Sequence, residues 1–244
     1  MRFVIVLALF AFGCAARNPP TVSSSRLPQV RIIGQSVQGR PIEMHTFGNG
    51  ASPVLVMAAI HGDETTSVNI ARGLLDELRI KPPATPVVII PVANPDGFAA
   101  GTRTNANKID LNRNFPSKNF NQRSPGRTFR GGAAPASEPE TRALIAVIDR
   151  LKPRLIITVH SIGDGKHCNN YDGPAKHIAD LMSRYNGYPS IPNIGYPTPG
   201  SLGNWGGNDR QIPMITLELP RSLPAERAWP DNRNAVLAAI AATK

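Results

Sequence analysis

One short run of the chain carries most of the information about its architecture: Val54-Leu55-Val56-Met57-Ala58-Ala59-Ile60-His61-Gly62-Asp63-Glu64. Its apolar part, residues 54–60, is typical of a strand buried on both faces of a sheet. An imidazole and a carboxylate, from His61 and Glu64, come directly after it. Open α/β sheets bind ligands at the carboxyl ends of their strands, so the end of this run is a candidate site.

Similar runs alternate with helical patterns along the rest of the chain. Three more apolar, β-branched runs are bounded by turn residues and predict buried strands: 87–92, 155–159 and 212–217. Four segments are predicted to be helical: 68–78, 137–151, 174–185 and 232–243. Ser137 and Glu140 have the spacing of a capping box at the start of the second helix.

The early part of the chain predicts an antiparallel start to the sheet, because residues 34–41 read as a hairpin turn. The alternating strands and helices that follow predict a largely parallel continuation. The expected fold class is therefore α/β: a single domain with a twisted, mixed parallel and antiparallel sheet and helices on both faces. A chain of 244 residues, 41% of them hydrophobic, is long enough to bury one substantial core.

The first residues have the pattern of an export signal. Arg2 precedes an apolar run at 3–12, which is too short to span a bilayer as a helix, since that takes about 20 residues. Gly13-Cys14-Ala15 follows and resembles the end of a bacterial lipoprotein signal, in which the cysteine carries the lipid. In the alternative, the signal is cleaved without lipidation and Cys14 is incidental.

These features predict a protein of the periplasm or cell envelope, with Cys14 as a lipid anchor and no other contact with the membrane. The serine- and proline-containing segment after Cys14 reads as flexible. The predicted organisation has three parts: a signal peptide of the lipoprotein type (1–13), a flexible tether (14–28) and the folded domain (29–244).

The formal charge of +10 could favour anionic partners, but a solvated basic surface is the preferred interpretation. No block of Lys and Arg and no interleaved aromatic stripe is present, so we do not expect a nucleic-acid partner. Cys168 is the one cysteine outside the leader, which excludes an internal disulfide from the folded domain.

Two more strand ends carry residue types that suit a metal site. His160 follows the run at 155–159, and Glu218 follows the run at 212–217. Neighbouring parallel strands would bring His61 and His160 together at one edge of the sheet. Two imidazoles and a carboxylate with an open fourth position are what catalytic Zn²⁺ requires. In the alternative, His61 and Glu64 only begin a helix and Glu218 forms a buried salt bridge.

A set of motifs resembles the zinc carboxypeptidases related to carboxypeptidase A. The motifs fall in that family's order and span nearly the whole body: Gly39-Arg40-Pro41-Ile42, His61-Gly62-Asp63-Glu64, Asn94-Pro95-Asp96-Gly97, Asp110-Leu111-Asn112-Arg113-Asn114-Phe115-Pro116, Ser137-Glu138-Pro139-Glu140-Thr141, His160-Ser161 and Leu217-Glu218-Leu219. The combination is far more specific than any single motif.

The resemblance implies one Zn²⁺ per chain, bound by His61, Glu64 and His160, with Asp110 orienting an imidazole. It implies that Glu218 acts as general base.

The resemblance also implies residues that bind the substrate. Asn112 and Arg113 would receive its terminal carboxylate, because a guanidinium can grip a carboxylate through two parallel hydrogen bonds. Arg103 resembles the arginine that stabilises the oxyanion, and Tyr196 resembles a mobile tyrosine that covers the substrate. The alternatives are a structural ion pair for Arg113 and a packed loop residue for Tyr196.

Within the family, three segments look most similar to the murein peptide amidases: 110–116, 195–201 and 217–220. Those enzymes hydrolyse the bond between γ-D-glutamate and meso-diaminopimelate in cell-wall peptides, so the expected partner is a wall peptide. The main alternative is a carboxypeptidase acting on ordinary peptides. Gly203, the nearest candidate for the base of the specificity pocket, predicts a wide, uncharged pocket.

Two further alternatives belong to other classes. A lipoprotein that binds wall peptides without cleaving them is disfavoured, because the metal-ligand set and Glu218 are all present. A thiol hydrolase using Cys168 beside His167 is disfavoured, because adjacent side chains rarely point at each other.

Overall fold

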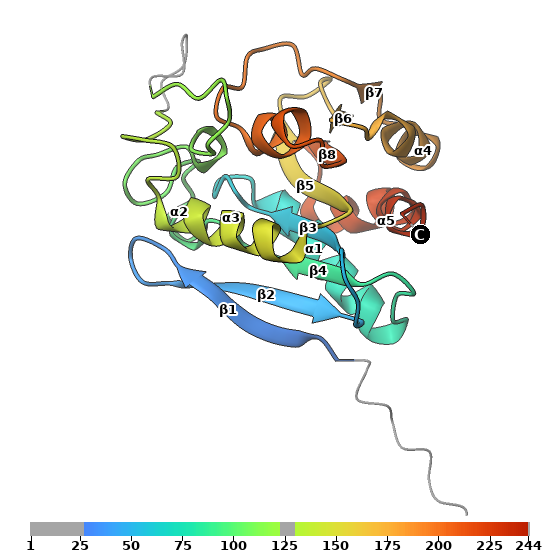
Figure 1. Ribbon diagram of the computed structural model, residues 1–244. Helices are drawn as coiled ribbons and strands as arrows, with labels where there is room; N and C mark the ends of the chain where they lie inside the picture. Colours follow the sequence, from blue (N-terminus) through green and yellow to red (C-terminus); the bar gives the residue numbers. More distant parts are fainter. Residues whose placement is uncertain (1–26, 123–129, 244) are drawn as a thin grey trace, which may run out of the picture.

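A mixed sheet of eight strands runs through the computed structural model, which describes residues 27–122 and 130–243 (Figure 1). Its spatial order is β1-β2-β4-β3-β5-β8-β6-β7. The strands have the following bounds: β1 (Gln29–Gln35), β2 (Pro41–Phe47), β3 (Val54–Ala58), β4 (Val87–Ile90), β5 (Leu155–Ile162), β6 (Cys168–Asp172), β7 (Ser190–Ile191) and β8 (Met214–Pro220). The central strands β4, β3, β5 and β8 run parallel to one another. Three pairs of neighbouring strands are antiparallel: β1 with β2, β2 with β4, and β8 with β6.

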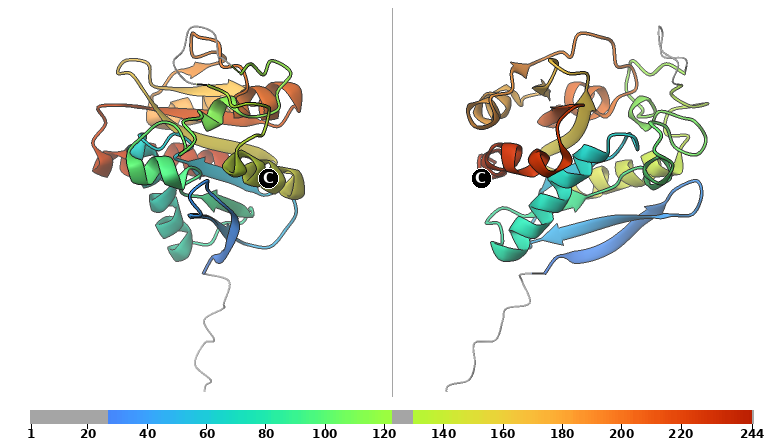
Figure 2. Two further views of the ribbon diagram at one scale, coloured as in Figure 1. Left: turned by 90° about the vertical axis from the view of Figure 1, so that its left-hand side faces the viewer. Right: turned by 180° about the vertical axis from the view of Figure 1, so that it is seen from behind.

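Helices cover both faces of this sheet, as predicted (Figure 2). The α-helices are α1 (Thr65–Ile80), α2 (Pro95–Ala100), α3 (Pro139–Leu151), α4 (Lys176–Asn186) and α5 (Ala225–Ala241). Two short segments have other helical geometries: the 3₁₀ turn η2 (Leu111–Arg113) and the π-helix η3 (Gly203–Asp209). Side chains of α1, α4 and α5 pack on one face and those of α3 on the other. Alternate residues of β3 explain why both faces are apolar, since Val54 and Val56 belong to the first core and Leu55 and Met57 to the second.

Two local predictions are wrong. Ser137 and Glu140 do not form a capping box: the N-cap residue of α3 is Glu138, and Glu140 instead accepts hydrogen bonds from Asn105 Nδ2 and the Val37 amide. The last helix starts at Ala225 rather than at residue 232 and includes Pro230. Its early turns are held by tertiary packing, because the Trp229 ring lies against Gly73 of α1, where no larger side chain would fit.

The predicted signal peptide and Cys14 lie outside the described residues, as does nearly all of the predicted tether. Among the helices that the structure describes, none has the length and apolar character needed to cross a membrane. Strand β1 begins at Gln29, close to the predicted start of the folded domain.

Candidate metal centre and active site

Three predicted metal ligands meet at the carboxyl edge of the sheet. His61 and Glu64 follow β3, Glu64 is the N-cap residue of α1, and His160 lies near the end of the neighbouring strand β5. Their donor atoms, each buried, all lie within 4.8 Å of one another. His61 Nδ1 is 2.9 Å from Glu64 Oε1 and 3.1 Å from His160 Nδ1, and His160 Nδ1 is 3.0 Å from Glu64 Oε2.

This arrangement fits a zinc ion. Zinc bonds of about 2.0–2.2 Å in a tetrahedral site place neighbouring ligand atoms about 3.3 Å apart, close to the separations seen here. The donor set of two imidazole nitrogens and one carboxylate is that of a catalytic zinc site. Because Nδ1 of both histidines faces the same point, the ring orientations also suit one shared cation.

Asp110 orients the first of these imidazoles. Its Oδ1 accepts a hydrogen bond from His61 Nε2 at 3.1 Å, which leaves Nδ1 of that ring as an electron-pair donor. Burial alone would raise the pKa of the Asp110 carboxyl, but His61 and Arg103 overcome that effect and hold the pKa well below its usual range. Asp110 is therefore an ionised partner that increases the basicity of His61.

Arg103 lies beside the same carboxylates. Its Nε donates to Asp110 Oδ2 at 3.0 Å, and its Nη1 is 3.4 Å from Glu64 Oε1. Burial opposes ionisation, yet the charges of Asp110 and Glu64 raise the pKa of the guanidinium, so it stays protonated. A fixed positive charge thus lies at the edge of the metal centre, where a developing negative charge would be stabilised.

Glu218 sits on β8 directly opposite His160 of β5. Burial raises the pKa of Glu218 above that of an exposed carboxyl, although His160 acts in the opposite direction. In the described part of the chain Glu218 forms no ion pair, which argues against the alternative that its role is a buried salt bridge. A raised pKa suits a carboxylate that has to take up a proton and release it again.

The side chains predicted to bind the substrate carboxylate come from the short turn η2. Asp110 caps this turn, since its carboxylate accepts a hydrogen bond from the Asn112 amide. Asn112 Oδ1 accepts from the Leu202 amide, and Arg113 Nη1 donates to the Asn112 carbonyl. Asn112 and Arg113 are thus held in place by the same loop that positions Asp110.

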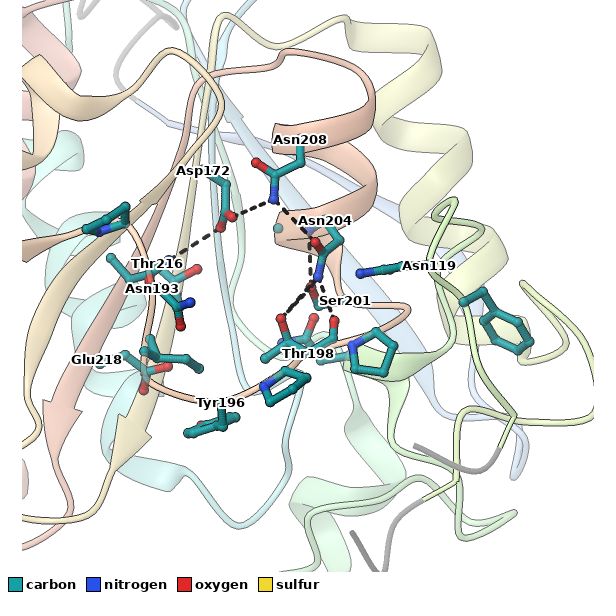
Figure 3. A pocket seen from close by; sticks show the side chains of 18 of the residues that line it. Asn119, Asp172, Asn193, Tyr196, Thr198, Ser201, Asn204, Asn208, Thr216 and Glu218 are labelled. Atoms are coloured by element: carbon teal, nitrogen blue, oxygen red, sulfur yellow. Dashed lines mark hydrogen bonds between the residues drawn. The ribbon is translucent and has the colours of Figure 1, made fainter. Parts of the chain in front are cut away.

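One cavity collects nearly all the predicted site residues. Its lining includes the three metal ligands, Glu218 and the four residues predicted to contact substrate: Arg103, Asn112, Arg113 and Tyr196. Tyr196 also lines the larger adjoining pocket, so it lies between the metal centre and that pocket. Figure 3 shows Tyr196 and Glu218 at one end of the larger pocket.

The larger pocket, about 560 Å³, corrects one prediction. Gly203 does line it, but the pocket is not uncharged, because Asp172 at the end of β6 is also part of its wall. The two residues touch: a Cβ at position 203 would clash with the Asp172 carboxylate. Sequence reasoning missed Asp172 because β6 is polar and carries no apolar pattern that predicts a strand.

The thiol alternative does not fit the structure. Cys168 is 1% exposed, and burial together with the nearby Glu218 raises the pKa of its thiol to about 12. The thiolate, which is the nucleophilic form, is therefore disfavoured at neutral pH. The ring of His167 packs against Tyr188, with 4.6 Å between ring centroids.

These observations agree with comparisons with known proteins. The chain belongs to the zinc carboxypeptidase family, whose sequence profile matches residues 22–171. It is accordingly a zinc-dependent hydrolase of the metallopeptidase class with Zn²⁺ as its cofactor.

Similar relatives include the murein peptide amidase A of Vibrio campbellii, 33% identical over 83% of this chain and 84% of the relative. The murein peptide amidase A of Escherichia coli K12 is 32% identical over 79% of this chain and 82% of the relative. The crystal structure of the murein-tripeptide amidase MpaA from Escherichia coli O157 has a TM-score of 0.72, with 27% identity, and covers 91% of this chain and 96% of that one. Bovine thrombin-activatable fibrinolysis inhibitor, at 20% identity over 89% of each chain and a TM-score of 0.75, shares the fold.

Proposed function

We propose that this protein hydrolyses the amide bond between γ-D-glutamate and meso-diaminopimelate in cell-wall peptides. One observation carries the proposal: a single cavity brings together a zinc-type ligand set, the buried carboxylate of Glu218 and the guanidinium of Arg113. That combination suits cleavage of an amide bond next to a free carboxyl terminus. The similarity to murein peptide amidases supports the choice of substrate.

His61, Glu64 and His160 would hold the zinc, which when bound supplies a Lewis acid that polarises a carbonyl and acidifies water. Glu218 would accept a proton from the attacking water and pass it to the leaving amine. The register of Glu218 opposite His160 supports this role, because its carboxylate would then lie next to the reacting atoms.

Three further residues would bind and orient the substrate. Arg113, together with Asn112, would receive the terminal carboxylate, so that only a bond close to a free end reaches Glu218. Arg103 would stabilise the negative charge that develops on the carbonyl oxygen. Tyr196, which lines both cavities, would cover the bound peptide and exclude water.

We also propose that the protein is exported and anchored to the envelope through a lipid on Cys14. The leader pattern at residues 1–15 supports this, and a wall peptide would be met in that compartment. Metabolic labelling with a radioactive fatty acid tests the anchor: wild type should incorporate label and Cys14→Ser should not. Label in both, or in neither, would contradict it.

The activity test uses zinc-loaded protein with L-Ala-γ-D-Glu-meso-diaminopimelate and, separately, an ordinary L-peptide, with and without a chelator. We expect chelator-sensitive release of diaminopimelate and no release from the L-peptide. Release from the L-peptide alone would make the protein a general carboxypeptidase. No release from either would favour a binding protein.

A further inference from the structure

The loop of residues 103–110 begins and ends with side chains of the metal centre. Arg103 Nε donates to Asp110 Oδ2 at 3.0 Å, and both residues also lie against metal ligands. The residues between them form neither a helix nor a strand. Hydrogen bonds of side chains and of the loop backbone therefore have to fix the shape of this loop.

Asn105, which is 3% exposed, organises the interior of the loop. Its Oδ1 accepts hydrogen bonds from the Asn107 and Ile109 amides, both at 3.1 Å. Its backbone amide donates to the Ile109 carbonyl at 3.0 Å, and its carbonyl accepts from the Lys108 amide at 2.9 Å. These four bonds fold the chain back on itself. Asp110 follows directly, so the direction of its side chain depends on this turn.

Two carboxylates at the start of α3 fix the other end of the Asn105 side chain. Its Nδ2 donates to Glu138 Oε2 at 2.8 Å and to Glu140 Oε2 at 3.1 Å. A side-chain amide has two donor hydrogens and an oxygen that can accept two hydrogen bonds. All four positions are used here, so a single orientation of the amide satisfies every partner.

The two carboxylates make that orientation hard to change. Glu138 is 4% exposed and Glu140 is fully buried, and neither forms an ion pair with a described residue. Burial raises the pKa of Glu140, as expected for a carboxyl group that depends on few donors. Turning the Asn105 amide over would bring its oxygen against both carboxylates, and such a contact between buried acceptors is costly.

These carboxylates belong to a rigid part of the fold. Glu138 is the N-cap residue of α3, and Leu144, Val147 and Ile148 of that helix are buried in the core on its face of the sheet. The position of α3 is thereby passed to the loop through one side chain, that of Asn105.

We infer that Asn105 is a positioning residue of the metal centre: by linking the loop 103–110 to Glu138 and Glu140, it directs Arg103 and Asp110 toward the metal ligands. This inference rests on the proposed function. Asn105 is not part of the lining of the cavity at the metal centre, so it acts through those two residues and not on the substrate.

The test compares wild type with Asn105→Asp, which keeps the size of the side chain but replaces its donor group by a carboxylate oxygen. The zinc affinity, from competition with a chromogenic chelator, should fall about 10- to 100-fold, because Asp110 loses its orientation toward His61. At saturating zinc, kcat on L-Ala-γ-D-Glu-meso-diaminopimelate should also fall about 10- to 100-fold as Arg103 shifts.

The change in KM should be smaller than the change in kcat. Asn112, which would help to bind the terminal carboxylate, is held from outside the loop by the Leu202 amide. An equal fall in kcat and rise in KM would show a general disturbance of the site, and would overturn the specific role of Asn105.

A rescue and a control separate positioning from stability. Asn105→Asp/Glu138→Gln/Glu140→Gln exchanges donor and acceptor at both contacts, and it should restore zinc affinity and kcat to within about 10-fold of wild type. The control Asn232→Asp alters a fully buried asparagine of α5 whose Nδ2 donates to the Ala228 carbonyl. It should lower the midpoint of urea unfolding but leave zinc affinity and kcat unchanged.

Wild-type zinc affinity and kcat in Asn105→Asp would overturn the inference, as would equal losses in the control or no recovery in a folded triple variant. If wild type binds zinc but releases no diaminopimelate, the proposed substrate fails, and the zinc affinities alone decide on Asn105. If Asn105→Asp does not fold, the smaller, uncharged Asn105→Ser takes its place, and an unchanged zinc affinity would again contradict the role.

Discussion

His160 and Glu218 are register partners across the adjacent parallel strands β5 and β8. Strands in a sheet lie about 4.8 Å apart, so a predicted metal ligand and the predicted general base have side chains side by side. Their relative position is set by backbone hydrogen bonds and two buried strands rather than by a loop. Two rigid strands hold catalytic groups at a fixed separation, as groups that have to act on the same atoms require.

Glu218→Gln should strongly slow hydrolysis without removing the metal. The amide keeps the size of the side chain but cannot take up a proton, and loss of a general base typically costs about 10²- to 10⁴-fold in rate. We expect a fall of that size in kcat with an unchanged zinc content by atomic absorption. Glu226→Gln, on the exposed first turn of α5, is the control. Substantial turnover by Glu218→Gln would remove Glu218 from the mechanism.

His160→Ala should lose zinc. The variant keeps only one imidazole and one carboxylate as metal ligands. Losing a residue that merely hydrogen-bonds a metal ligand typically lowers metal affinity by about 10- to 100-fold, and losing a ligand itself should lower the zinc affinity by more than that. The metal content after dialysis measures this, with the exposed His177→Ala as control. Retention of zinc at wild-type affinity would show that the metal binds elsewhere.

Asp110→Asn should weaken zinc binding by about 10- to 100-fold, because the ionised partner of His61 is replaced by a neutral one. A competition titration with a chromogenic chelator gives the affinity. Asp149→Asn, which removes a surface carboxylate paired with Arg210, should have no effect. Equal affinities for the Asp110 variant and wild type would contradict the orienting role.

Arg113→Lys should raise KM by about 10- to 100-fold, because lysine keeps the charge but cannot form two parallel hydrogen bonds with a carboxylate. The same variant should discriminate less against a substrate whose terminal carboxyl is amidated. Steady-state kinetics on the free and amidated peptides measure both effects, with the exposed Arg150→Lys as control. An unchanged KM would indicate that Arg113 has a structural role.

Asp96→Asn should lower the stability at neutral pH by about 1–3 kcal/mol. Asp96 accepts hydrogen bonds from the Ser36 hydroxyl and the Gln38 amide and pairs with Arg40, which ties the hairpin turn to α2. Burial alone would raise the pKa of Asp96, but the hydrogen bonds from Ser36 and Gln38 and the charge of Arg40 hold it below its ordinary value of 3.8.

The pKa of Asp96 is lower in the folded state than in the unfolded state. Its contribution to the free energy of unfolding is therefore complete above about pH 4–5 and is lost as the pH falls through the folded-state pKa. Urea unfolding from pH 7 to pH 3 should therefore show a gap between wild type and variant that is constant above that range and narrows below it. A gap that widens on acidification would contradict the assignment.

The predicted strands 54–60, 87–92, 155–159 and 212–217 correspond to β3, β4, β5 and β8, because each is a continuous apolar run whose burial on both faces is visible locally. The motifs predict the family, and they also contain His61, Glu64 and His160, the three residues that could hold the zinc. The start of α5 and the cap of α3 were mispredicted because contacts of Trp229 and Glu140 with distant segments override local preference.

Local sequence is therefore enough to predict the central strands of the sheet, the family and the residue types of the metal centre, since these depend on neighbours along the chain. Contacts between distant segments bring Asp110 opposite His61, 49 positions away, and put Asp172 at the end of the pocket, and neither arrangement is visible in the local sequence. The polar strand β6 has no apolar pattern of its own. Its register against β8 is fixed by long-range hydrogen bonds, and that register decides which of its side chains face the large pocket.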